Sequence, residues 1–374
     1  MSFSQVVMYI IVIFMLAAAF DKITMGRFHL ELKESFDEGI ESMGPLALSV
    51  IGMLSLAPAM KGAVLKAVGP IYGLVGADPA MVAGAFLSSD TGGYALACEL
   101  TEDYRVACFS GLILASIFGA VISFTIPIAL GIIKEADRPL FFKGVLFGII
   151  ATPVGNILGG LAAGYPIGLA ATNTIPTIVI ALLLGIGVKF FSAKMIKGFD
   201  IFGKAIVTII MIGLVAAIVE QETGIVVIKG MAPISEGFEL VGTLAIFLAG
   251  AFPMLKVLSK LLNKPLKKAG AILKVNEAAV LGFIACLANV IPMLSLMKDM
   301  DERGKVINSA FAVSGAFILG DHMAFTASID KELLLPMLIA KGTAGLIAVI
   351  LAVIATRNIT GEANTEAGRV QQSA

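Results

Sequence analysis

The stretch GAFLSSDTGGYALA, residues 84–97, places one carboxylate inside a segment that is otherwise apolar or small. Asp90 is followed by Thr91 and by the pair Gly92 and Gly93, and glycines weaken a helix. A charged side chain at the centre of a bilayer costs roughly 2.5–3.5 kcal/mol on insertion scales, whereas a soluble core can hold one as a hydrogen-bonded cap. The surroundings of this stretch therefore decide what the aspartate does.

The composition of the chain is that of a membrane protein. Of its 374 residues, 58% are hydrophobic and 14% are charged, whereas soluble domains carry about 25% charged residues. Apolar runs long enough to span a bilayer, about 20 residues each, recur along the chain. The sequence therefore predicts an all-α polytopic membrane protein with about 10–12 membrane segments, some of them broken or re-entrant.

Charge and metal-ligating residues exclude several other classes of protein. The chain has 27 basic and 27 acidic residues, so nothing in its charge predicts nucleic-acid binding. The three cysteines have no spacing typical of a zinc site or a disulfide framework, and the two histidines have no second ligand nearby. No metal site and no cofactor are expected. These residues are Cys98, Cys108, Cys286, His29 and His322.

Hydropathy divides the chain into one integral membrane domain, residues 1–356, and a polar, disordered tail, residues 357–374. The first apolar segment has no basic residues ahead of it, so it is predicted to be a membrane helix that stays in the protein rather than a cleaved signal peptide. A polar helix over 27–43 is expected at the membrane interface. The expected membrane spans are 3–20, 44–60 ending near Pro58, 105–130, 140–163, 166–188, 200–219, 238–257, 276–297, 305–327 and 333–356.

Three basic segments predict how the chain is oriented in the membrane. Residues 134–143, 189–204 and 256–268 are rich in lysine, and pairs of expected spans separate them. Lysine and arginine collect on the cytoplasmic side of membrane proteins. All three segments are therefore predicted to be cytoplasmic.

A second aspartate sits in a context like that of Asp90. VAGAFLSSD (82–90) aligns with VSGAFILGD (313–321) at a constant offset of 231, which places Asp321 opposite Asp90. Seven expected crossings separate the loops that follow, 98–104 and 328–331, so the two copies are predicted to run in opposite senses. Inverted repeats with broken helices that meet near the midplane are a common plan of secondary transporters.

This pattern predicts a polar site lined by two broken helices, because unwound backbone is tolerated at membrane depth only where protein or water satisfies it. Other interpretations of the same residues remain open. Each aspartate could cap a helix at the membrane surface. Asn289 could hydrogen-bond neighbouring helices, and His322 could be a hydrogen-bond partner rather than a proton shuttle.

Five longer stretches, spread along the chain, carry a further signal. They are FLSSDTGGYALACEL (86–100), SFTIPIALGII (123–133), MIKGFDIFGKAIV (195–207), GAFPMLKVLSKLLNKPL (250–266) and DERGKVINSAFAVSGAFILGDHMAF (301–325). Together they resemble one family, the membrane permease of bacterial ethanolamine-utilisation operons, and the resemblance runs in order from the first helix to about residue 355. Ser89 departs from a variant of the motif that has cysteine there, while the aspartate and both glycines match.

The resemblance implies a transporter, not an enzyme, that imports ethanolamine across the bacterial cytoplasmic membrane for breakdown inside. Its partners would be ethanolamine and the lipid bilayer, and a homo-oligomer is compatible with it. Ethanolamine is mostly a cation at neutral pH, which suits carboxylates in a low-dielectric site. Asp90 and Asp321 are expected to face the ammonium group, and Tyr94 and Phe325 to cover it by cation–π contact. Expected to complete the site are Thr91, Asn289 and His322 at the hydroxyl group and Gly92 and Gly93 at the break.

Two rival functions use similar residues. A channel-like facilitator, or a transporter of another small cation, would also place carboxylates in the membrane. An intramembrane aspartyl protease would use two aspartates that share a proton. The protease is disfavoured because Ile318 stands where its Gly-x-Gly-Asp motif needs the first glycine.

Overall fold

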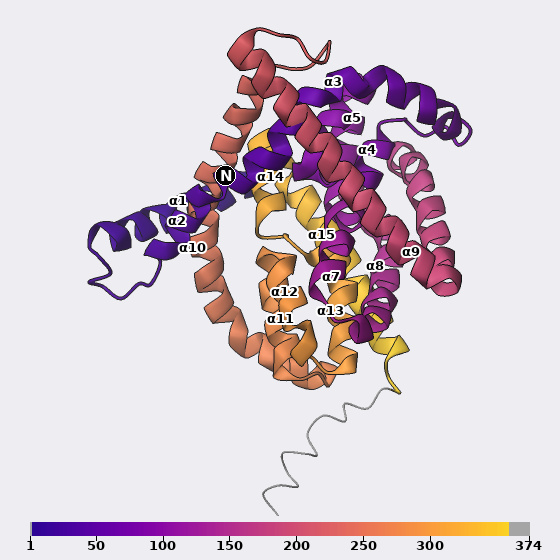
Figure 1. The fold of residues 1–374 in the computed structure, drawn as a ribbon. Coiled ribbons are helices and arrows are strands. Elements are labelled where there is room, and N and C mark those ends of the chain that lie inside the picture. The colour runs from indigo at the N-terminus through magenta and orange to yellow at the C-terminus, as the bar shows by residue number, and fades with distance from the viewer. Residues whose placement is uncertain (1, 359–374) are drawn as a thin grey trace, which may run out of the picture.

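The computed structural model describes residues 2–358, and every regular element in that range is a helix (Figure 1). Seven helices there are long and apolar enough to cross a membrane, and a bent pair, α6 (Tyr104–Cys108) with its continuation to α7 (Ile126–Ile132), makes eight. The prediction of an all-α polytopic membrane protein is confirmed. Residues 359–374 of the predicted tail lie outside the described range.

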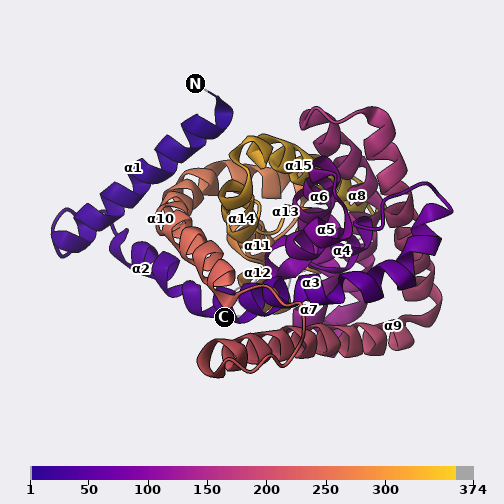
Figure 2. The same ribbon diagram turned by 90° about the horizontal axis from the view of Figure 1, so that it is seen from above.

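The long helices form the frame of the molecule. α9 bends at Phe191, where the backbone leaves helical geometry, and so supplies two of the spans. The short α2 (Lys33–Glu41) occupies the predicted interfacial segment and packs against α10. Figure 2 shows α9 along one outer edge and α1 projecting on the opposite side. The long helices are α1 (Phe3–Ile23), α3 (Met43–Gly73), α8 (Arg138–Ala162), α9 (Ile167–Thr223), α10 (Ile234–Leu273) and α15 (Leu334–Ala355).

Some predicted span boundaries were wrong. α3 does not end near Pro58 but continues to Gly73, because neighbouring groups can compensate the hydrogen bond that a proline removes from a membrane helix. The expected spans 276–297 and 305–327 are not continuous helices. The first is divided into α11 (Glu277–Ala288) and α12 (Val290–Leu296), and the second into α13 (Glu302–Gly315) and α14 (Asp321–Ile329).

α15 defines the two ends of the helix bundle, because it runs from one to the other over 22 residues, about 33 Å at the usual helical rise. Just before it, Tyr104 Oη donates a hydrogen bond to Asp330 Oδ2 at 3.0 Å. Just after it, Arg303 Nη1 donates to the Thr356 carbonyl at 2.6 Å. We refer to these as the Asp330 end and the Thr356 end.

The first hairpin, residues 78–101, enters and leaves at the Asp330 end. It consists of α4 (Met81–Phe86), an unwound tip and α5 (Tyr94–Leu100). Thr101 Oγ1 donates to Asp78 Oδ2 at 2.9 Å, which closes the hairpin base. α6 begins immediately beyond this base, capped by Asp103, and the Arg105 guanidinium holds the pKa of the Asp103 carboxyl below its usual range. The segment is therefore re-entrant rather than a crossing.

The second hairpin, residues 276–301, enters and leaves at the opposite end. It consists of α11 and α12 joined at Asn289. The Asn276 backbone N–H donates to Asp301 Oδ1 at 3.0 Å, and the Asn276 side chain donates to the Asp299 carbonyl at 2.8 Å. Arg303, which follows directly, contacts Thr356. The two hairpins thus point toward each other from opposite ends of the bundle.

The hairpins belong to an inverted repeat whose sequence offset is 198 residues, not 231. Ser110 Oγ donates to the Ala80 carbonyl of the first hairpin at 2.6 Å, and Asn308 Nδ2 donates to the Ala279 carbonyl of the second at 3.0 Å. Each hairpin is thereby held by the helix that follows it. The two members of each equivalent pair are 198 residues apart in the sequence. The pairs are Asp78 and Asn276, Gly84 and Gly282, Asp103 and Asp301, Ser110 and Asn308, and Lys143 and Lys341.

The predicted pairing of Asp90 with Asp321 was therefore wrong in register. Asp90 belongs to a hairpin tip, whereas Asp321 begins the second half of a crossing helix. The loops 98–104 and 328–331 lie at the same end, joined by Tyr104 and Asp330, and not at opposite ends as expected. The alignment matched small and apolar residues that recur throughout this composition.

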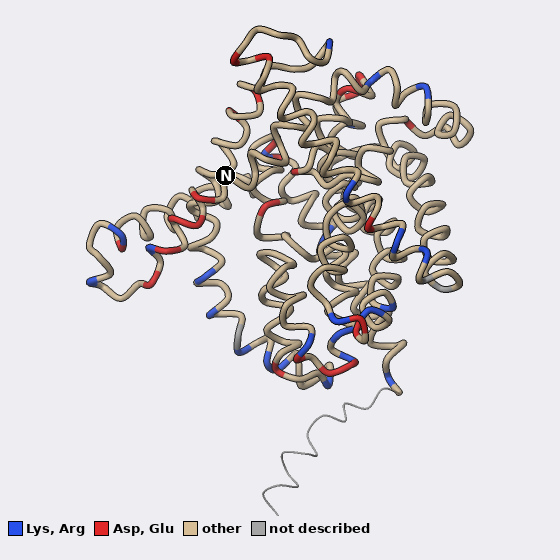
Figure 3. The backbone as a smooth tube through the Cα atoms, viewed as in Figure 1, with Lys and Arg blue, Asp and Glu red and all other residues tan. Residues whose placement is uncertain are grey.

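Charged residues gather toward the two ends of the bundle and on the projecting α1 and α2 (Figure 3). The three basic segments lie toward the Thr356 end, where Lys305 pairs with Asp137 at 2.7 Å and the ring of Phe142 stacks on that of Phe199. Their grouping agrees with the predicted topology. That this end faces the cytoplasm stays a prediction.

Candidate functional site

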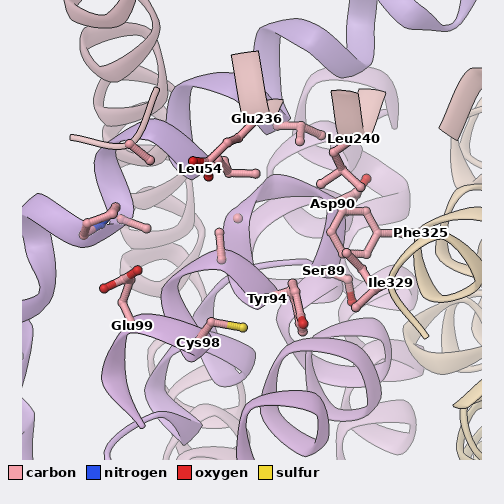
Figure 4. Close-up of a pocket in the computed structure, with 16 residues that line it drawn as sticks. Leu54, Ser89, Asp90, Tyr94, Cys98, Glu99, Glu236, Leu240, Phe325 and Ile329 are labelled. Atoms are coloured by element: carbon pink, nitrogen blue, oxygen red, sulfur yellow. The ribbon is translucent and has the colours of Figure 1, made fainter. Parts of the chain in front are cut away.

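A cavity of about 180 Å³ opens beside the tip of the first hairpin. We call it the Asp90 cavity. Its walls come from the first hairpin, α3, the start of α10 and α14, and Figure 4 shows Glu99 across the cavity from Asp90 and Phe325. Three carboxylates line it, those of Asp90, Glu99 and Glu236, and no lysine, arginine or histidine is among its lining residues in the described part of the chain. Such a cavity favours a cation.

The backbone at the tip adopts a shape that depends on glycine. Gly92 has a φ of +99°, and a Cβ at this position would overlap the Met53 side chain. The tip is fixed from outside by Ser123, whose Oγ accepts a hydrogen bond from the Ser88 N–H at 3.0 Å. The break predicted at the two glycines is therefore present. It turns the chain so that Asp90 reaches the cavity at membrane depth.

Two aromatic rings line the cavity close to the carboxylate. Tyr94 begins α5 and Phe325 lies on α14, and their ring centroids are 6.2 Å apart in an edge-to-face arrangement. Both helices run toward the Asp330 end, which brings these positions side by side. The structure thus places Asp90, Gly92, Tyr94 and Phe325 around one cavity.

Thr91 and Gly93 shape the tip and are not among the residues that line the cavity. Thr91 Oγ1 donates to the Ser88 carbonyl at 3.3 Å, and the Gly93 N–H donates to the same carbonyl at 2.9 Å. These two residues hold the unwound turn together. That Thr91 and Gly93 contact the substrate stays a prediction.

A buried chain of hydrogen bonds runs from Asp90 into the protein. Ser88 Oγ donates to Asp90 Oδ1 and lies 3.1 Å from His322 Nε2. His322 Nδ1 lies 3.0 Å from Lys341 Nζ, which donates to the Ser116 carbonyl at 2.7 Å. Lys341 has no exposed surface, and His322 is 2% exposed. Sequence reasoning missed Ser88 and Lys341, although Lys341 is the one charged residue of the apolar helix α15.

Asp321 lines a different cavity, of about 330 Å³, between the tip of the second hairpin, α2 and α10. Asn289 and Lys256 also line it. Successive residues of a helix point about 100° apart, so His322 contacts Ser88 while Asp321 lines the other cavity. Asp321 and Asn289 thus line a cavity separate from that of Asp90, and that they contact the substrate stays a prediction.

Comparisons with known proteins bear on what this arrangement does. The chain matches the family model described as "Ethanolamine utilisation protein, EutH" over residues 3–355. No solved structure matches. Among the described residues no group of three or more His, Cys, Asp and Glu side chains could hold a metal ion.

Curated relatives align over nearly their whole length. A protein of Listeria monocytogenes named "Probable ethanolamine permease EutH" is 47% identical over 353 residues, 94% of each chain. Proteins of the same name from Salmonella typhimurium and Escherichia coli are each 40% identical, covering 98% and 95% of this chain and 99% and 96% of their own. The chain therefore belongs to the EutH family, a family of multi-pass membrane permeases rather than enzymes.

Proposed function

We propose that this protein imports ethanolamine, as its protonated cation, across the bacterial cytoplasmic membrane, and that the Asp90 cavity receives the substrate. The observation that carries the proposal is the lining of this cavity, with three carboxylates and no basic side chain among the described residues. The names of the relatives, ethanolamine permease, support the substrate.

The cavity suits a small primary ammonium group. Such a group donates several hydrogen bonds, and the Asp90 carboxylate and the carbonyls of the unwound tip can accept them. Charge-assisted hydrogen bonds contribute about 1.5–3 kcal/mol each. Tyr94 and Phe325 add two ring surfaces against which a cation can lie.

Choline should be a poor substrate for the same site. Its quaternary ammonium has no N–H to donate, so choline sites generally rely on cages of several aromatic rings. Among the described residues that line the Asp90 cavity, the aromatic ones are Tyr94 and Phe325. The loss of one or two hydrogen bonds should weaken binding roughly ten- to a thousandfold.

Uptake of labelled ethanolamine into proteoliposomes containing the purified protein tests the proposal. We expect saturable uptake above that of protein-free liposomes, competed by unlabelled ethanolamine and hardly by an equal concentration of choline. Uptake that does not exceed the protein-free control would contradict the function. Linear, unsaturable flux would indicate a channel-like facilitator, and equal competition by choline would contradict the hydrogen-bonding site.

A further inference from the structure

The core around the Asp90 cavity holds one buried carboxylate and one buried amine in the same hydrogen-bonded chain. The Asp90 side chain is 16% exposed, and Lys341 is fully buried. The ionisable groups near Lys341 in the described part of the chain are His322 at 3.0 Å, Asp90 and the buried thiol of Cys286. A buried charge is strongly destabilising unless an opposite charge compensates it. Asp321 on α14 also acts electrostatically on Asp90, but it lines the other cavity and, in the part of the protein that the structure describes, has no hydrogen bond to this chain. Within the chain, one carboxylate can compensate one cation.

The hydrogen bonds of this chain all point the same way. Ser88 donates its hydroxyl proton to Asp90, which leaves Ser88 Oγ free to accept from His322 Nε2–H. With its proton on Nε2, the imidazole presents a lone pair at Nδ1, which accepts from Lys341 Nζ. One histidine tautomer therefore satisfies every contact. The result is an unbroken path from the Lys341 ammonium to a carboxylate at the wall of the cavity.

We propose that each ethanolamine cation that binds at Asp90 displaces one proton from Lys341 through His322 and Ser88, so that transport is electroneutral. This inference rests on the proposed function. In the empty site, the Lys341 ammonium compensates the Asp90 carboxylate. When the substrate ammonium takes that carboxylate, Lys341 gives up a proton and becomes a neutral amine. The proton moves from Lys341 to His322 Nδ1, the Nε2 proton of His322 moves to Ser88, and the Ser88 proton moves to Asp90. Asp90 releases this proton into the cavity as the substrate ammonium takes the carboxylate, so the total charge of the buried site is unchanged. After the substrate leaves, a proton that enters at Asp90 travels the same chain in reverse and restores both Lys341 and the original histidine tautomer.

The consequence is a transporter that the membrane potential does not drive. One substrate cation crosses inward and one proton returns outward in each cycle, so the net movement is that of the uncharged base. Without the proton step, a monovalent cation would accumulate about fiftyfold across a potential of about 100 mV. The two cases differ in a quantity that can be measured on the unmodified protein.

The inverted repeat supplies a matched control for Lys341. Lys143 occupies the equivalent position 198 residues earlier, also followed by glycine. It is only partly buried, and it makes no hydrogen bond or ion pair within the range that the structure describes. Replacing Lys143 removes the same charge from the symmetry-related place and leaves the Asp90 chain intact.

The first experiment measures ethanolamine uptake into proteoliposomes with a potassium–valinomycin potential, negative inside, of about 100 mV. We expect the initial rate and the final accumulation to be unchanged by the potential, with a protein-dependent rise of internal pH reported by a trapped dye. Accumulation that follows the potential as for a monovalent cation would overturn the inference. Absence of protein-dependent uptake would instead contradict the proposed function.

The second experiment counts protons released in weakly buffered detergent solution when ethanolamine binds. The unmodified protein and Lys143→Met should each release about one proton per substrate bound, and Lys341→Met should bind ethanolamine with almost none released. Release from Lys341→Met equal to that of the unmodified protein would overturn the role of Lys341. If Lys341→Met does not fold, the potential measurement on the unmodified protein decides the question.

Discussion

The two hairpins share a plan but differ in the chemistry of their tips. Each is closed at its base by a polar pair and is hydrogen-bonded to the following helix, through Ser110 in one half and Asn308 in the other. The first tip carries Asp90, which faces a cavity and joins a buried chain to Lys341. The second tip carries Asn289, whose side chain accepts from the Ile291 N–H and so caps α12.

This difference shows how a symmetric fold can hold an asymmetric site. The inverted repeat places an unwound tip at depth from each end, because hairpins of similar length enter from both. The first tip carries its own carboxylate and joins a buried lysine, whereas the charged groups at the second tip, Asp321 and Lys256, come from α14 and α10. We infer that the first hairpin binds the cation and that the second mainly shapes the opposite wall of the pathway.

The largest effect is expected from Asp90→Asn. Removing one member of a buried charge pair typically costs about 3–5 kcal/mol, so kcat/KM for ethanolamine uptake should fall at least about a hundredfold. The matched variant Asn289→Ser keeps a capping oxygen and should change uptake less than about threefold. Near-normal uptake by Asp90→Asn would remove the first hairpin from the site. A loss of uptake in Asn289→Ser as large as that in Asp90→Asn would mean that the two hairpin tips contribute equally to transport.

Asp321→Asn sharpens the same contrast. Because Asp321 lines the other cavity, we expect a smaller loss than for Asp90→Asn, measured in the same uptake assay on protein that elutes as a single species. An equal loss would restore the sequence-based expectation that both aspartates contact the substrate.

The thermal stability of variants should show that glycine is needed at two breaks, the tip of the first hairpin at Gly92 and the break between α13 and α14 at Gly320. At Gly92 the positive φ and the Met53 side chain both oppose alanine, and at Gly320 a Cβ would overlap the Ala288 carbonyl oxygen. Each substitution should cost about 1–3 kcal/mol and lower the Tm in detergent by several degrees. The control Gly342→Ala lies in a helix with open space around it and should leave Tm unchanged or slightly raised. A normal Tm for Gly92→Ala would contradict the geometry of the tip.

The smallest effects are expected at the two equivalent hydrogen bonds. Ser110→Ala removes the bond to the Ala80 carbonyl and the bond from the Gly84 N–H, and Asn308→Ala removes bonds to Ala279 and Gly304. A typical hydrogen bond contributes about 0.5–1.5 kcal/mol, so both variants, each of which loses two bonds, should lower Tm by a similar few degrees. A drop in Tm for only one of them would mean that the repeat is not held in the same way in its two halves.

Much of this fold was predictable from the sequence, and the parts that were not depend on long-range contacts. Local composition was enough for the long membrane helices and for the break at Gly92, because hydropathy and glycine act over a few residues. It was not enough for the second hairpin, whose apolar residues 276–297 have the hydropathy of a continuous span. The offset of 198 was missed because its signature is a set of separated caps, such as Asp103 and Asp301, while chance matches of Gly, Ala and Phe favoured 231. Lys341 was missed because its partner His322 lies on another helix.

Cysteine accessibility tests the opposite entry of the two hairpins most directly. In a variant without the native cysteines, single cysteines at the exposed positions Glu102, Lys331 and Lys298 would be labelled in intact cells with a membrane-impermeant maleimide. The structure predicts that the first two, at the Asp330 end, label from one side and Lys298, beside the base of the second hairpin, from the other. By the lysine-rich segments, Lys298 should be the cytoplasmic one. Labelling of Glu102→Cys and Lys298→Cys from the same side would contradict the inverted hairpins.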